Sequence, residues 1–180
     1  METKNLIIRE SVFDDCSYFA DWETNPEVTE FFSIDEDRNY EEIVTEFIEN
    51  KLDDSKKQFT IMKKPNDIPI GRIYLSRVDR HCDSLDITRI YIADSNLRNQ
   101  GYGKEALLAI LEYAFINLHM ERVTIDFFVK NKAAEHLYDK LGFRTEGILR
   151  NAIKKNGRYF DLHLKSMIRA EYLGLDRTLV

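Results

Sequence analysis

The chain has 180 residues, 43% of them hydrophobic, and a formal net charge of −6 at pH 7; this predicts one domain over residues 1–180 with a sizeable core and argues against a nucleic-acid groove. It contains no apolar run of about 18 residues and no signal-peptide segment, and its two cysteines cannot form a disulfide framework, so we expect a cytoplasmic protein that does not enter a membrane. Its four histidines are too far apart for metal ligands, so we expect no metal.

The first 60 residues predict one strand followed by two helices. Leu6–Glu10 has the apolar, β-branched content of an opening strand. A helix is predicted over residues 14–24 and should end there, because Pro26 disfavours helical angles in the residue before it. A second helix is predicted over Tyr40–Leu52, with Asn39 as its N-cap.

Acidic residues are concentrated in this same part of the chain. Residues 1–60 hold 17 Asp and Glu against 6 Lys and Arg, whereas the remaining 120 residues hold 15 against 20. A solvated acidic helix surface would explain this excess, and so would a rim that attracts a cationic substrate. The connection between the two helices is aromatic and then acidic, so it could line a substrate mouth or bury its phenylalanines in the core. The residues assigned to such a mouth are Phe31, Phe32, Asp35, Glu36 and Glu41.

The middle of the chain predicts a meander of three antiparallel strands, at residues 58–64, 70–78 and 85–93. A helix is predicted over residues 105–118, because apolar residues recur there at helical spacing. Residues 121–130 form a nearly continuous apolar run, which predicts a strand buried on both faces. A strand, a helix and a strand in this order predict a right-handed parallel crossover.

A turn with two glycines joins the third strand of the meander to the 105–118 helix. Its sequence from position 98 to position 104 is Arg-Asn-Gln-Gly-Tyr-Gly-Lys. The N–H groups of such a turn and of the first helical residues lack internal partners, and the helix dipole adds positive charge, so the turn predicts an anion site. The spelling does not fit a Walker loop, since Glu105 follows the Gly-Lys pair, and it lacks the third glycine of a dinucleotide fingerprint. What remains is Arg-x-x-Gly-x-Gly.

A second informative stretch follows the 121–130 strand. Asn131 can cap a helix, and Gly142 can end it in the left-handed conformation. Asn131 and Tyr138 are seven residues apart, so they lie on nearly the same face of that helix. By itself, Tyr138 would be interpreted as an ordinary half-buried tyrosine.

Together, the two stretches resemble the GNAT acetyltransferases. In that family Arg/Gln-x-x-Gly-x-Gly/Ala cradles the diphosphate of coenzyme A. The second motif of the family, Asn-x-x-Ala-x-x-x-Tyr-x-x-x-Gly-Phe, is matched by Asn131, Ala134, Tyr138, Gly142 and Phe143. The tail, residues 145–172, resembles the closing hairpin of the branch that contains ribosomal-protein N-terminal acetyltransferases and spermidine acetyltransferases. The resemblance implies an α/β fold: a twisted mixed sheet of six or seven strands with helices on both faces.

The resemblance also implies where acetyl-CoA binds: the pantetheine arm would lie between the strands at 85–93 and 121–130, which splay apart. The residues implied in cofactor binding are the backbone of Tyr91, Ile92 and Ala93, the turn residues Arg98, Asn99, Gln100, Gly101, Tyr102, Gly103 and Lys104, and Asn131. Tyr138 would protonate the departing thiolate. Relatives often carry glutamate where Thr88 stands. The proton acceptor or water anchor is therefore open between Asp86, Thr88 and a water relay.

Three amine acceptors fit this chemistry: the N-terminal amine of a protein, a polyamine such as spermidine, or another small amine. The branch is best populated by enzymes that act on protein termini, so the resemblance favours an acceptor of the ribosomal-protein type. A non-catalytic module that binds acyl-CoA as a sensor is the alternative of another class, and an intact Tyr138 favours the enzyme. A homodimer is left open.

Overall fold

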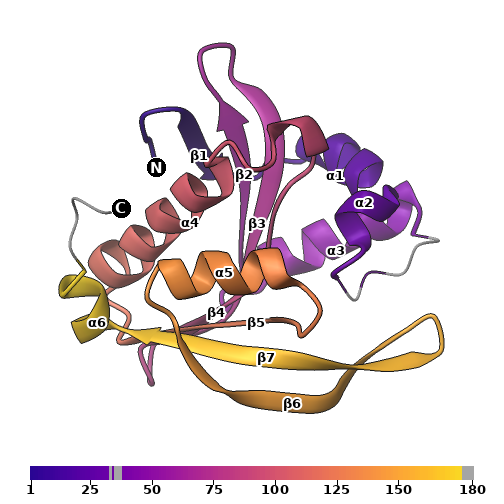
Figure 1. Ribbon diagram of the computed structural model, residues 1–180. Coiled ribbons are helices and arrows are strands. Elements are labelled where there is room, and N and C mark those ends of the chain that lie inside the picture. The colour runs from indigo at the N-terminus through magenta and orange to yellow at the C-terminus, as the bar shows by residue number, and fades with distance from the viewer. Residues whose placement is uncertain (33, 35–37, 176–180) are drawn as a thin grey trace.

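A seven-stranded mixed sheet, in the order β1-β2-β3-β4-β5-β7-β6, forms the centre of the fold (Figure 1). The computed structural model of the chain describes residues 1–32, 34 and 38–175. The strands are β1 (Leu6–Glu10), β2 (Lys57–Lys63), β3 (Ile68–Asp79), β4 (Ser84–Ile92), β5 (Arg122–Phe128), β6 (Arg144–Lys155) and β7 (Arg158–Ile168). All neighbouring pairs are antiparallel except β4 and β5, which are parallel. The predicted α/β fold and its mixed sheet are confirmed.

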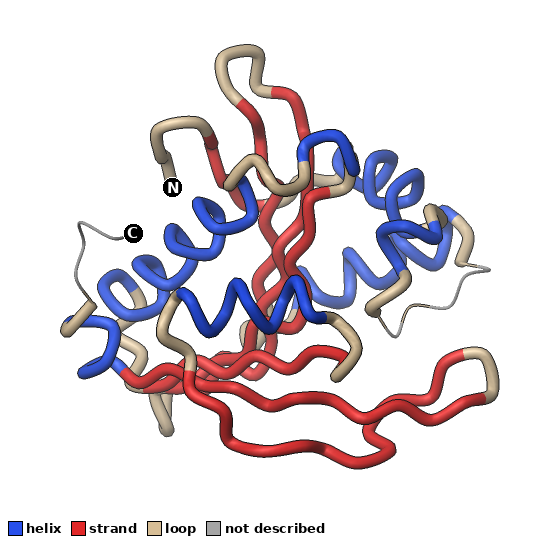
Figure 2. Tube along the Cα trace, viewed as in Figure 1, coloured by secondary structure: helices blue, strands red, loops and turns tan. Residues whose placement is uncertain are grey.

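Helices lie on both faces of this sheet, as the sequence predicts. The α-helices of the described ranges are α1 (Asp15–Glu23), α2 (Pro26–Thr29), α3 (Tyr40–Leu52), α4 (Tyr102–Glu112), α5 (Lys132–Lys140) and α6 (Arg169–Leu173). In Figures 1 and 2, α1, α2 and α3 gather on one side, whereas α4 and α5 lie on the other. Within the described ranges, none of these helices is long and apolar enough to cross a membrane.

The predicted helix ends are built by the residues expected to cap them. The side chain of Asn39 accepts a hydrogen bond from the Glu42 N–H (3.0 Å), and the Glu42 carboxylate accepts one from the Asn39 N–H (3.0 Å), which completes a capping box. Asn131 caps α5 by accepting from the Ala134 N–H (3.1 Å), and Gly142 follows α5 with φ +89°. The sequence missed α2 because four residues are too few for a helical period to show.

Three apolar clusters hold the helices of the described ranges to the sheet, the smallest of which is formed by Val28, Tyr91 and Ala93. The largest cluster lies under α4 and α5 and contains fully buried α4 side chains such as Leu107, Ile110 and Leu111. The second cluster lies between α1 and α3 and consists of Cys16, Phe19, Ile43 and Phe47. The long predicted helix starts at Tyr102, and its last turn, Tyr113–Asn117, is π-helical.

The parallel pair β4–β5 is joined only over its first half. Pairing runs from Ser84 opposite Arg122 to Ile87 opposite Ile125, yet both strands continue beyond that point. On the other side of β4, Thr88 is an extra residue in the pairing with β3, which makes a β-bulge where the pairing with β5 ends. The two strands then diverge (Figure 2), as the family resemblance implied.

Gly71 of β3 marks a close approach to the diverging half of β4. It lies opposite Ile92, and a Cβ at this position would overlap the carbonyl oxygen of Tyr91. We therefore expect Gly71→Ala to lower the free energy of unfolding by about 1–3 kcal/mol in urea denaturation, since two strand backbones must move apart. The control is Gly147→Ala on β6, where a Cβ meets nothing within 4 Å. Equal losses in the two variants would contradict this close approach.

Candidate active site

The glycine turn between β4 and α4 is shaped to bind an anion. Asn99 and Gly101 both have left-handed backbone angles, with φ +61° and +91°. Within the described ranges, the backbone N–H groups of residues 101–103 donate no backbone hydrogen bond. The turn leads directly into α4, whose N-terminal end carries partial positive charge. The turn therefore offers the donors that the sequence predicts there.

Arg98 is engaged by backbone carbonyl groups instead of facing solvent. Its Nε donates to the Ile92 oxygen (3.2 Å), and its Nη2 donates to the oxygens of Ala93 (3.3 Å) and Glu27 (3.2 Å). The guanidinium thereby ties the end of β4 to α2. In this structure Arg98 fixes the position of the turn, and the free donors belong to the turn's backbone.

The other residues that were assigned to the diphosphate turn lie at the start of α4 or just before it. Gln100 Nε2 donates to the Asn96 oxygen (2.7 Å) and braces the turn. Tyr102 is half-buried at the start of α4, with the ammonium of Lys63 5.5 Å from its ring centre. Gly103 and Lys104 belong to the first turn of α4.

Tyr91, Ile92 and Ala93 lie in or just beyond the diverging half of β4 and are buried. Pairing with β5 ends at Ile87, so the backbone edge of this half has no strand beside it. The Tyr91 side chain turns towards α1, where its hydroxyl donates to Glu23 (3.0 Å). The backbone edge that the resemblance assigns to the pantetheine arm is therefore only partly open, because the Ala93 N–H donates to the Ile70 oxygen of β3 (2.8 Å) and Arg98 donates to the oxygens of Ile92 and Ala93.

Tyr138 of α5 is buried beside β5 with 6% of its surface exposed. Its ring packs edge-on against Phe127 (5.1 Å between ring centres) and lies 5.8 Å from Phe143. Burial, together with the charge of nearby Asp126, raises the pKa of the Tyr138 hydroxyl well above its ordinary value. The hydroxyl therefore keeps its proton at neutral pH and can donate it.

Two carboxylates lie where the strands diverge. Asp86 of β4 and Asp126 of β5 are each within one residue of the last paired position. Burial, and then the neighbouring charge of Asp86, raise the pKa of Asp126. Burial also raises the pKa of Asp86, against the opposing effect of Arg77, with which Asp86 forms an ion pair. A carboxylate with a raised pKa is suited to accept a proton.

Sequence reasoning named Asp86 but missed Asp126. Asp126 lies inside the apolar run at residues 121–130, which was interpreted only as a strand buried on both faces. A single acid in such a run was the signal that could have identified it. Thr88 is exposed, and its hydroxyl is 2.6 Å from the Ser76 hydroxyl, so it lies near Asp86, which is opposite Ser76.

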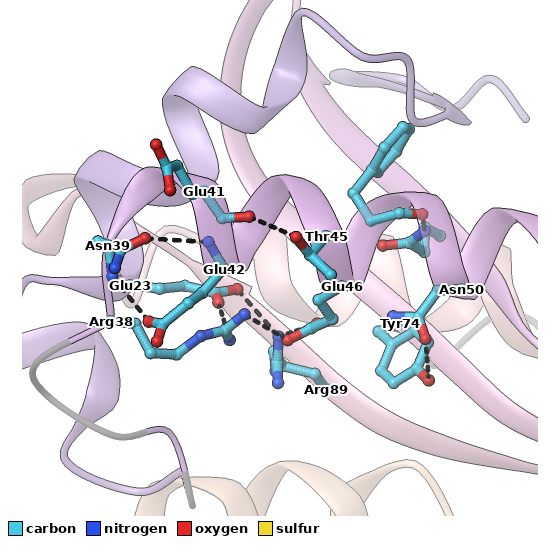
Figure 3. A network of polar contacts seen from close by, with 12 residues as sticks. Glu23, Arg38, Asn39, Glu41, Glu42, Thr45, Glu46, Asn50, Tyr74 and Arg89 are labelled. Carbon is cyan, nitrogen blue, oxygen red and sulfur yellow. Dashed lines mark hydrogen bonds and ion pairs between the residues drawn. The ribbon is translucent and has the colours of Figure 1, made fainter.

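Only some of the described carboxylates near the expected substrate mouth face solvent. Phe32 is half-buried with its ring 5.7 Å from the Tyr91 ring, Phe31 is also half-buried, and Glu41 is exposed. Asp35 and Glu36 lie outside the described residues. Other α3 carboxylates are engaged within the protein: Glu42 in the capping box and Glu46 in ion pairs with Arg38 (2.6 Å) and Arg89 (3.3 Å) (Figure 3).

A groove of about 490 Å³ lies elsewhere, between the N-terminal segment, α4 and the end of α6. Gly101 and Lys104 line one end of it, so the groove meets the glycine turn, but Tyr138 and Asp126 do not border it. The groove is therefore not the place where the reacting groups meet.

Comparison with known proteins identifies the family of the chain. Residues 8–164 match the family model described as acetyltransferase (GNAT) domain. The chain is 25% identical over 178 residues to the uncharacterized N-acetyltransferase p20 of Bacillus licheniformis, covering 96% of this chain and 97% of p20. It is 22% identical over 169 residues to spermidine N(1)-acetyltransferase of Vibrio cholerae, covering 94% of this chain and 96% of that protein.

Solved structures share the fold. The crystal structure of spermidine N-acetyltransferase from Vibrio cholerae, in complex with CoA and spermine, superposes with a TM-score of 0.87 at 21% identity, covering 96% of this chain and 100% of that chain. At this identity the likeness concerns the fold. The family model, in contrast, leaves only the two ends of the 180 residues unmatched, and the chain therefore belongs to the GNAT acetyltransferase family.

Proposed function

We propose that this acetyl-CoA-dependent N-acetyltransferase acetylates a primary amine of a small polycation of the polyamine type. The observation that carries the proposal is the pair of carboxylates where β4 and β5 diverge: Asp126, whose charge acts on Tyr138, and Asp86, whose charge acts on Asp126 and which also pairs with Arg77. Negative groups at that point attract an ammonium group and can take its proton. The Vibrio cholerae relative acts on spermidine by its name, which supports the same acceptor class. The polyamine therefore replaces the protein N-terminal amine as first choice.

The proposal gives acetyl-CoA three contacts. The N–H groups of residues 101–103 hold the diphosphate, and the partly open backbone edge of Tyr91, Ile92 and Ala93 pairs with the pantetheine arm as an added strand would. Asn131, whose side-chain oxygen caps α5, lies on the far side of the arm. These contacts place the thioester near Tyr138.

The proposed reaction is direct transfer. The neutral amine nitrogen attacks the thioester carbonyl, a C–N bond forms, the C–S bond breaks, and the sulfur leaves as thiolate. The ammonium group first loses one proton to solvent. Asp126 then accepts the proton that the nitrogen loses on attack, Tyr138 donates its proton to the thiolate, and the proton on Asp126 returns to Tyr138 through solvent, which restores both side chains. Thr88 and Ser76 could anchor a water between the amine and the carboxylate. Alignment of the two reactants supplies the rest of the acceleration.

The turn assignment predicts the behaviour of Gly101→Val. We expect acetyl-CoA affinity to fall at least about tenfold in isothermal titration, because a branched side chain strains the left-handed backbone that shapes the turn. The control is Gly157→Val in the β6–β7 turn: its φ is +74°, and like Gly101 it has nothing within 4 Å of a Cβ. A folded Gly101→Val protein with unchanged affinity would show that the turn does not bind the cofactor.

The two reacting side chains predict a pH–rate profile. Asp126 accepts a proton only when ionised, so kcat/KM should fall as the pH drops through its raised pKa, above the usual range of an aspartate. Asp126→Asn should lower kcat and remove this acidic limb. Tyr138→Phe should lower kcat about 100-fold with little change in acetyl-CoA affinity, since the thiolate develops only as the bond breaks. Because the attacking amine must itself be deprotonated, an acidic limb whose apparent pKa is the same in Asp126→Asn as in wild type would exclude Asp126 as the acceptor.

The acceptor class is tested by CoA-thiol release with spermidine and with peptides that begin with Ala or Ser. We expect kcat/KM for spermidine to exceed that for the peptides at least about tenfold and to fall with added salt. Glu41→Lys, on the exposed surface of α3, should raise the KM for spermidine, whereas Asp54→Lys, exposed beyond α3, should not. Preferential turnover of the peptides would restore the protein N-terminus as acceptor.

A further inference from the structure

Glu23, near the end of α1, is fully buried and accepts hydrogen bonds from side chains of β3 and β4. Figure 3 shows it beside Arg38 and Arg89. Its Oε1 accepts from Arg72 Nη1 (2.7 Å) and from Arg89 Nη1 (3.0 Å). The same oxygen accepts from the hydroxyl of Tyr91 (3.0 Å). Burial opposes ionisation, but Arg89 and Arg72 hold the pKa of Glu23 below its usual value, so the carboxylate stays charged.

The network extends from Glu23 to α3 and to the segment before it. Arg38 donates to Glu23 Oε2 (3.2 Å) and pairs with Glu46, which also contacts Arg89. Arg72 is fully buried, and its Nη2 donates to Gln58 (2.6 Å). Three arginines thus surround two glutamates, which anchors α1, α3, β3 and β4 to one another. Removing one partner would leave a charge buried without its counter-ion.

Arg89 and Tyr91 give this network a place in the proposed site. Both follow the Thr88 bulge and therefore lie in the half of β4 that has no β5 strand beside it. This half of β4 is held by its pairing with β3 on one side, and on the other side it has side-chain contacts in place of a neighbouring strand. The Tyr91 ring is also enclosed, with ring centres of Trp22 at 6.1 Å and Phe32 at 5.7 Å.

We infer that Glu23 is a positioning residue for acetyl-CoA. Through the Tyr91 hydroxyl and the Arg89 guanidinium it fixes the backbone edge of the diverging half of β4. This inference rests on the proposed function, in which that edge pairs with the pantetheine arm. Glu23 does not touch the cofactor; it keeps the edge in the geometry that hydrogen bonding to the arm requires, so the binding energy is not spent on ordering the strand.

The test compares the acetyl-CoA affinity of two tyrosine-to-phenylalanine variants, one in β4 and one in β3. Tyr91→Phe removes the hydroxyl that reaches Glu23 and leaves the arginines in place. Tyr74→Phe is the matched control: Tyr74 has the same 8% exposure and donates one hydrogen bond, to Asn50 of α3 (3.3 Å), but lies on β3. We expect Tyr91→Phe to raise the Kd of acetyl-CoA about three- to tenfold and its KM in parallel, with kcat at saturation nearly unchanged. Tyr74→Phe should leave all three unchanged.

A second measurement separates positioning from stability. Thermal unfolding should shift by similar amounts in the two variants, because each loses one buried hydrogen bond. Unchanged affinity in Tyr91→Phe, or equal losses of affinity in both variants, would overturn the role of Glu23. Wild-type protein that binds no acetyl-CoA would instead refute the proposed function itself, so the two failures are distinguishable. In Glu23→Gln, the further effect of Tyr91→Phe should be smaller than in wild type, since the two act through one contact.

Discussion

The parallel pairing of β4 and β5 stops at Ile87 and Ile125, and the rest of the site depends on that termination. Parallel strands in a sheet normally satisfy each other's backbone groups along their length. Here the bulge at Thr88 turns β4 away from β5, so one backbone edge is left without a strand. Asp86 and Asp126 lie at the point of divergence. The turn beyond β4 adds its own free N–H groups.

Ion pairs hold both sides of this divergence. On one side, Glu23 fixes β4 through Arg89 and Tyr91. On the other side, α5, which carries Tyr138, is tied to β7 by the ion pair of buried Lys165 with the exposed carboxylate of Asp139, and by the contact of His163 with Glu135 (3.6 Å). Charge pairs with low exposure have little freedom to move, which is a useful property in a site that must align two reactants.

Local signals in the sequence predicted much of this structure. Asn39, Asn131 and Gly142 act where they were expected because capping depends on near neighbours in the chain. The glycine turn was recognised for the same reason. The order of strands and helices predicted the crossover, and the resemblance of the two motifs to the GNAT family implied the mixed sheet.

What the sequence did not reveal comes from contacts between distant segments. The acidic excess of the first 60 residues was interpreted as a solvated surface or a substrate rim, but Glu46 within it is engaged by arginines from the segment before α3 and from β3 and β4. Arg98 was assigned to the diphosphate, yet carbonyl groups of β4 and α2 hold its side chain. The Thr88 bulge depends on pairing with β3, and Asp126 was hidden by apolar neighbours. Ion pairs and strand pairing between segments that are distant in the chain produce neither a periodic pattern nor a motif in the sequence.

The central claim is that acetyl-CoA occupies the partly open edge of β4, and amide hydrogen exchange with and without saturating acetyl-CoA tests it most directly. The account predicts slower exchange in residues 89–93 and 99–104 on binding. Residues 84–87 should change little, because β5 already pairs with them. Saturated binding that leaves exchange in residues 89–93 unchanged and protects another part of the chain would contradict the account.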